Sequence, residues 1–221
     1  MRAKDWKSVK TAKVLLIGED SNLQWSDDVP EFVMFANYYF REFPTDHGER
    51  SRHVEAQNLF AHLREVTAGK FKPDEVYVTN LCREPLPHAP KGKRVLIPEE
   101  RAQEGLEHIQ WILIANPSIE WIVPMSLQVN YWLQKLDFYT TDPSFLTAAE
   151  PRRTGMNNGE PYYQPVDGKA FSQICGSMYE AKEQTAKVVP ILPAKDFPLR
   201  ERNLEVFGEA YKKLKTYFSS L

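Results

Sequence analysis

Four short, mainly apolar runs occur along the chain, and each of them predicts a buried β-strand. The runs lie at residues 13–17, 75–79, 120–124 and 188–192. The first run contains V-L-L-I and enters Gly18, which is typical of a strand that is buried on both of its faces. Strands of this kind are the usual components of a parallel sheet.

Between these runs, apolar residues recur at spacings of three and four, and this period predicts helices. The predicted helices cover residues 31–43, 49–66, 98–115, 126–136 and 199–218. Strands that alternate with helices favour right-handed crossovers and a parallel sheet. The pattern therefore predicts an α/β fold with a four-stranded parallel sheet.

Residues 137–187 interrupt the alternation, because this stretch is rich in proline, glycine and asparagine. We interpret it as an irregular insertion in a single domain that covers residues 1–221. A hairpin is expected around Val166-Asp167-Gly168-Lys169. The insertion contains aromatic residues that would be exposed in a free segment, so we expect it to pack on the domain.

The composition narrows the classes of function. The chain has 221 residues, of which 42% are hydrophobic, enough for a sizeable core. It contains no run of 18 apolar residues and no apolar signal sequence, which predicts a protein without membrane contact. The two cysteines, Cys82 and Cys175, suit a reducing cytoplasm. The net charge of −2 gives no general attraction to nucleic acid, although a local basic face is compatible with it.

The loops that follow the predicted strands are the first places to look for chemistry. In parallel sheets, ligands bind beyond the carboxyl ends of the strands. The candidate loops are residues 18–22, 80–83, 125–126 and 192–195. The five histidines show no spacing that is typical of metal ligands, so no metal site is expected. No cofactor is expected either.

Read together, these loops resemble those of the uracil-DNA glycosylase superfamily. The segment V-L-L-I-G-E-D-S-N at 14–22 is similar to the strand and loop that carry the water-activating acid in that family. The segment D-E-V-Y-V-T-N-L-C-R-E-P at 74–85 resembles the iron–sulfur type of these enzymes, and V-V-P-I-L-P-A at 188–194 occupies the place of a histidine-containing motif. The resemblance implies a three-layer α/β/α domain that removes a damaged base from DNA.

The resemblance also implies roles for individual residues. Asp20 matches the carboxylate that positions water and stabilises the sugar cation, and Glu19 is the alternative. Asn80 matches the amide that reads the edge of the base in that family. An amide suits this role because it offers both a donor and an acceptor. Gly18 belongs to the same base-binding loop. An aromatic residue is expected to stack on the base, and the candidates are Trp25, Phe32 and Phe35.

Basic residues near Asn80 are candidate phosphate contacts. They are Arg83, Lys93 and Arg94, together with Lys195 after the last strand. Together with these residues, the resemblance implies single- or double-stranded DNA as the partner.

Three departures from the family pattern leave alternatives open. Ser21 replaces a proline, and Leu192 replaces the histidine that supports the leaving base. Two cysteines are too few for the four-thiolate cluster of the iron–sulfur type. The hypotheses are therefore a divergent glycosylase, a catalytically inactive protein that binds a nucleobase, a nucleic acid or a protein partner on the same fold, and an unrelated small-molecule hydrolase with a doubly wound sheet.

Overall fold

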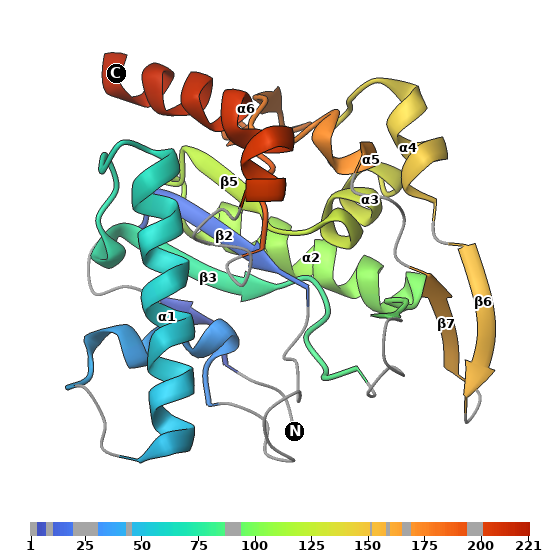
Figure 1. Cartoon of the computed structure of the whole chain (residues 1–221), viewed down its shortest axis with the longest axis horizontal. Helices are drawn as coiled ribbons and strands as arrows, with labels where there is room; N and C mark the ends of the chain where they lie inside the picture. Colours follow the sequence, from blue (N-terminus) through green and yellow to red (C-terminus); the bar gives the residue numbers. More distant parts are fainter. Residues whose placement is uncertain are drawn as a thin grey trace.

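A mixed β-sheet with helices on both faces forms the centre of the protein (Figure 1). The computed structural model describes residues 4–7, 11–19, 31–42, 46–86, 94–150, 152–157, 160–164, 169–193 and 201–221. The fold class is α/β, as the alternation of strands and helices predicts.

The sheet has six strands in the order β1-β3-β2-β5-β9-β8. They are β1 (Trp6–Lys7), β2 (Val14–Gly18), β3 (Val76–Asn80), β5 (Trp121–Pro124), β8 (Tyr179–Glu180) and β9 (Lys187–Val188). The inner strands β3, β2, β5 and β9 are parallel, whereas β1 and β8 pair antiparallel at the two edges. The expected four-stranded parallel sheet is therefore corrected to a mixed six-stranded sheet. Both edge strands have two residues, too few to show the two-residue period of a strand in the sequence.

The fourth predicted strand, at 188–192, is shorter than expected. Only Lys187 and Val188 form a ladder with β5, and Ile191 makes a single bridge to Met125. Pro190 interrupts the segment, because proline has no N–H group to donate to a ladder.

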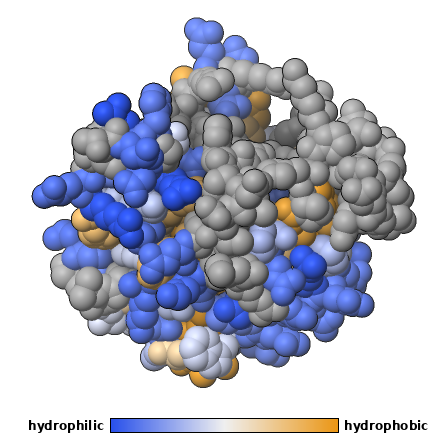
Figure 2. All heavy atoms as spheres, turned by 90° about the horizontal axis from the view of Figure 1, so that it is seen from below, coloured by the Kyte–Doolittle hydropathy of each residue, from blue (hydrophilic) through white to orange (hydrophobic). Residues whose placement is uncertain are grey.

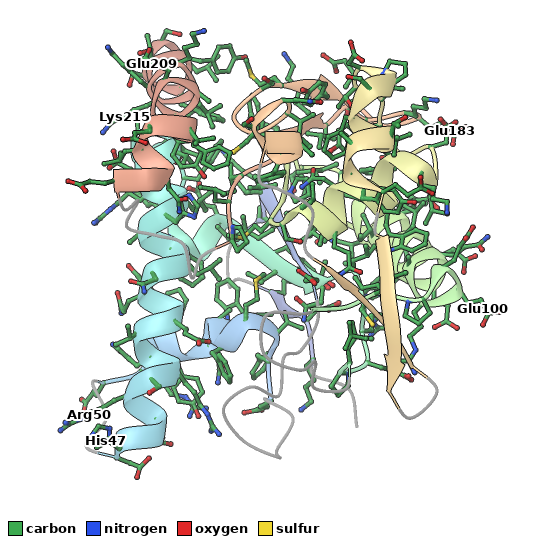
Figure 3. The ribbon with its side chains drawn as sticks, turned by 45° about the vertical axis from the view of Figure 1, so that its right-hand side comes forward. His47, Arg50, Glu100, Glu183, Glu209 and Lys215 are labelled. Atoms are coloured by element: carbon green, nitrogen blue, oxygen red, sulfur yellow. The ribbon has the colours of Figure 1, made fainter. Side chains whose placement is uncertain are left out.

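The four long helices lie where the sequence predicts them. They are α1 (His47–Val66), α2 (Glu99–Ala115), α3 (Leu127–Lys135) and α6 (Glu201–Ser220). Val66 of α1 and Phe218 of α6 line one small apolar space with Trp121 of β5, so both helices cover the same face of the sheet. Helix α2 lies on the opposite face, behind the sheet in Figure 1 and to its right in Figure 3.

The helix predicted at 31–43 is a shorter 3₁₀ segment, η1 (Val33–Phe40), and it is kinked. Met34 and Phe35 have φ angles of 50° and 52°, in the left-handed region that side chains other than glycine rarely adopt. This backbone costs roughly 1–2 kcal/mol per residue. The packing of η1 must compensate for that cost, and no helical period in the sequence can reveal it.

The segment 137–187 is more regular than the irregular insertion that was predicted. It contains α4 (Pro143–Ala149), β6 (Arg152–Asn157), β7 (Glu160–Gln164) and α5 (Lys169–Ser172), and it ends with β8 and the first residue of β9. Strands β6 and β7 form a hairpin, and β4 (Arg94–Val95) adds to it as a third strand. The turn expected around 166–169 lies outside the described residues, except for Lys169 at the start of α5. The pairing of β6 with β7 extends to Asn157 and Glu160.

The remaining 3₁₀ turn, η2 (Pro73–Glu75), leads into β3.

Figure 2 shows the end of the molecule at which α1 begins, and the described side chains there are mainly hydrophilic with small hydrophobic areas between them. Within the described residues, no helix combines the length and the apolar character needed to cross a bilayer.

Two helical glycines provide a matched test of this packing. A Cβ atom at Gly105 of α2 would lie 1.9 Å from the carbonyl oxygen of Leu81, whereas one at Gly208 of α6 would meet nothing within 4 Å. We expect Gly105→Ala to lower the free energy of unfolding by about 1–3 kcal/mol because the helix must move away from Leu81. Gly208→Ala is expected to raise it by roughly 0.5–1 kcal/mol through helix propensity. Urea unfolding measures both, and equal effects would contradict the close approach of α2.

Candidate functional site

The ends of β2 and β3 bring together two segments that the sequence singles out. Gly18 and Asn80 are paired in the parallel register of these strands. The ladder continues past both strands, since the N–H of Leu81 donates to Gly18 at 2.9 Å and the N–H of Cys82 donates to Glu19 at 2.9 Å. Glu19 and Asn80 are therefore held at one edge of the sheet by main-chain hydrogen bonds.

Gly18 is required by the side chains that lie against it. A Cβ atom at this position would lie 2.3 Å from Oδ1 of Asn80 and 2.8 Å from Sδ of Met34. The side chain of Asn80, which is 1% exposed, thus packs directly on the backbone of Gly18. Any larger residue at position 18 would displace the amide or the thioether.

Met34 is the residue at this site that the sequence analysis missed. It reaches Gly18 through the left-handed kink at the start of η1. Phe35, the candidate stacking residue, packs instead with Tyr38 and Ala56, and the guanidinium of Arg52 lies 5.8 Å from its ring. Phe32 packs at the edge of the main core. Strained backbone of this kind is frequently found at functional sites.

The carboxylate of Glu19 is oriented by a buried glutamine. Nε2 of Gln128, in the first turn of α3, donates to Oε1 of Glu19 at 2.6 Å. The same amide accepts from the N–H of Ile97 at 2.5 Å and donates to the carbonyl of Val95 at 3.3 Å. Gln128 therefore connects the loop after β2 with the segment after β4.

The turn between β5 and α3 is the third element at this edge. Ser126 has a φ angle of 125° and caps α3 by accepting from the N–H of Val129 at 3.3 Å. Nδ2 of Asn130 donates to the carbonyl oxygens of Ser126 at 2.7 Å and Pro124 at 3.3 Å. These bonds hold the turn in its positive-φ conformation, and Ser126 is the N-cap of α3.

Leu192 is fixed by a buried tyrosine from α6. Its N–H donates to the hydroxyl of Tyr211 at 2.9 Å, and Nε2 of His62 in α1 lies 2.9 Å from the same hydroxyl. Burial lowers the pKa of His62 to about 4. Burial also raises the pKa of the Cys175 thiol to about 12, while hydrogen bonds with Tyr211 and Leu192 act in the opposite direction. The side chain of Leu192 is 6% exposed and has no group that donates a hydrogen bond.

The remaining predicted site residues are only partly described. Asp20, Trp25, Lys93 and Lys195 lie outside the described residues, and Arg94 begins β4. Arg83 is half-buried. Burial, and after it the carboxylate of Asp5, raise the pKa of the Tyr77 hydroxyl above its usual value, and the positive charge of Arg83 partly opposes this shift.

Within the described parts of the chain, no group of three or more His, Cys, Asp or Glu side chains is placed to hold a metal ion. The groups that the described site offers are an amide, a carboxylate and a thioether, on Asn80, Glu19 and Met34. Such groups can bind a polar planar ligand and activate water.

The neutral, buried His62 makes stability depend on pH. Between pH 6.5 and about 4 the unfolded chain binds a proton that the folded protein does not bind. The unfolding free energy is therefore expected to fall by about 3 kcal/mol as the pH decreases through this window. His62→Gln should lose this part of the pH dependence, because glutamine keeps a hydrogen-bonding group near Tyr211 without a titrating ring. Urea unfolding at both ends of the window measures the effect, and an unchanged pH dependence in the glutamine variant would contradict the assignment.

The sequence matches no model of a known protein family, and no curated protein matches it either.

Proposed function

We propose that the protein is a divergent member of the uracil-DNA glycosylase superfamily that hydrolyses the N-glycosidic bond of a damaged base in DNA. The observation that carries this proposal is the packing of the Asn80 amide on Gly18 at the ends of two parallel strands. Glu19 follows Gly18 in the chain, and its carboxylate is hydrogen-bonded to Gln128 of α3. In α/β proteins this edge of the sheet is the usual ligand site.

Asn80 is proposed to read the base. Its side-chain amide has a donor and an acceptor, which complement the O4 and N3–H groups of a flipped uracil. Burial of the amide strengthens this discrimination, because a base with the wrong edge leaves buried polar groups unpaired. The thioether of Met34 provides an adaptable apolar wall next to the amide.

An acid after β2 is proposed to assist the hydrolysis. The bond between the sugar carbon and the base nitrogen breaks, and the base leaves with the electron pair. Water then adds to the sugar carbon and gives up a proton, which the carboxylate accepts. Glu19 is oriented for such a role by Gln128, and Asp20 is the neighbouring carboxylate that the resemblance favours. This route needs water as the co-reactant and no cofactor.

A second candidate function is binding without catalysis. Leu192 favours it, since this residue stands in the place of the family's histidine and its side chain cannot stabilise the leaving base. Loss of a donor of this type costs about a hundredfold in rate or more. On this alternative, the same Asn80 site would hold a nucleobase or a nucleic acid.

A single-turnover assay on uracil-containing single- and double-stranded DNA tests the enzyme hypothesis. We expect slow release of uracil by the wild type. Asn80→Ala should reduce the rate by about tenfold or more, because the amide no longer binds the base edge. Asp20→Asn and Glu19→Gln should show which carboxylate acts, through a reduction of similar size in one of them.

Glu209→Gln is a matched control, because Glu209 is an exposed carboxylate on α6 that points away from the protein (Figure 3). It should leave the rate unchanged. Retention of uracil-containing DNA without release of the base would favour the binding alternative. If the protein neither releases uracil nor retains the DNA, both functions are refuted.

Leu192→His provides a gain-of-function test. A histidine at this position restores a hydrogen-bond donor where the family places one, so base release should accelerate by about tenfold to a hundredfold. Leu192→Met is the control for a change of side chain without a donor, and it should behave like the wild type. Equal rates for the two variants, with both of them folded by circular dichroism, would remove position 192 from the proposed site.

A further inference from the structure

A stripe of exposed residues runs along the outer surface of α2, away from the candidate site. It consists of Glu100, Glu104, Glu107, Trp111 and Ile114, at successive spacings of four, three, four and three. This spacing places all five residues on one face of the helix. Trp111 is 60% exposed and Ile114 is 75% exposed, so the stripe is acidic in its first half and apolar in its second half.

The exposed tryptophan has a fixed orientation. Its ring stacks on His108 with a centroid distance of 5.9 Å and an interplanar angle of 13°. Nε2 of His108 lies 2.5 Å from Oδ2 of Asp5, and Oδ1 of Asp5 accepts from Thr79 at 2.8 Å. Trp111 is thus held by a chain of contacts that reaches the sheet. A preoriented side chain loses little conformational entropy when a partner covers it.

A groove of about 460 Å³ continues the apolar half of the stripe. Its walls come from the end of α2 and from the segment before β9. They include Leu113, Ile114 and Ile119 on one side and Glu183 on the other. Ile114 belongs to both the stripe and the groove. Figure 3 shows Glu100 and Glu183 pointing away from the protein on the same side.

The charge of this surface is acidic, because it carries four glutamates and three of the cations near it pair with other carboxylates. Arg101 pairs with Glu84, Lys135 with Glu99 and Lys182 with Asp137. No ion pair to another described residue neutralises the carboxylates of Glu100, Glu104, Glu107 and Glu183. The groove also lies before the first residues of β5 and β9, at the end of the sheet opposite to Asn80. DNA phosphates are repelled from such a surface, so its partner differs from the proposed substrate.

We propose that this stripe and groove form a docking site for a partner polypeptide that presents an apolar side chain flanked by lysine or arginine. The apolar side chain packs on Trp111 and in the groove, while the basic residues meet the four carboxylates. Tryptophan is among the residues that contribute most to binding energy at protein interfaces. Charge complementarity selects a basic partner over an acidic one. This inference goes beyond the proposed hydrolysis and does not depend on it.

A random-peptide library displayed on phage tests the docking site. The full-length protein is the bait, and Trp111→Ser is used for counter-selection. The side chain of Trp111 is exposed, so replacing it by serine leaves the core intact. We expect enrichment of peptides with an apolar residue next to lysine or arginine. A synthetic copy of an enriched peptide should bind Trp111→Ser at least about tenfold more weakly than the wild type.

Two further measurements test the role of the carboxylates and the possibility that a second copy of the chain occupies the surface. The double variant Glu104→Gln/Glu107→Gln should also bind the peptide more weakly than the wild type. Added salt should reduce the difference in affinity between the two proteins, because it screens the charges. Glu209→Gln, on α6, is the matched control and should bind like the wild type. Enrichment of peptides without basic residues, or equal binding by all variants, would overturn the proposal. A wild-type dimer that Trp111→Ser dissociates in light scattering would overturn it as well, because a second copy would then occupy the surface.

Discussion

The close approach of two side chains to the backbone of Gly18 is the constraint on which the candidate site depends. Asn80 and Met34 both occupy space that any Cβ atom at position 18 would need. Because Gly18 and Asn80 end adjacent parallel strands, the register of the sheet fixes the position of the amide. The left-handed kink of η1 delivers the thioether to the same point. Main-chain pairing and one absent side chain thus determine which groups meet at this edge.

A second close contact connects the end of β3 with helix α2 on the opposite face of the sheet. Gly105 allows α2 to lie directly on the carbonyl group of Leu81, the residue that follows Asn80. The helix that supports the candidate site on its inner side therefore carries the acidic and apolar stripe on its outer side. The two proposed binding surfaces share one rigid element but lie at different ends of the sheet. The ligands proposed for them are also of opposite charge, with DNA at one surface and a basic polypeptide at the other.

Buried polar side chains of α3 connect the segment 137–187 to the core. The hydroxyl of Tyr139 donates to Oδ1 of Asn130 at 2.5 Å and accepts from Nε2 of Gln134 at 3.1 Å. The hydroxyl of Thr141 donates to Oε1 of Gln134 at 2.5 Å. Burial raises the pKa of Tyr139 well above its usual value, so this hydroxyl remains a donor. Such satisfied networks fix one arrangement of a segment and explain why this segment does not behave as an independent loop.

The sequence by itself determined the α/β class and the positions of the long helices and inner strands along the chain, because these features depend on local hydrophobic periods. The order of the strands in the sheet came from the tertiary structure. The sequence also located Gly18, Glu19 and Asn80 at strand ends, where ligands bind in parallel sheets. Only the tertiary structure decided the antiparallel edge strands, the hairpin of β6 and β7 and the position of Met34. Two-residue strands carry no period, and a left-handed kink depends on packing between η1 and the sheet. Trp111 lies within a helix that the sequence predicts, and a helical period does not say which large side chains stay exposed. The exposure of Trp111 is a property of the folded surface, and that is why no pattern along the chain could establish it.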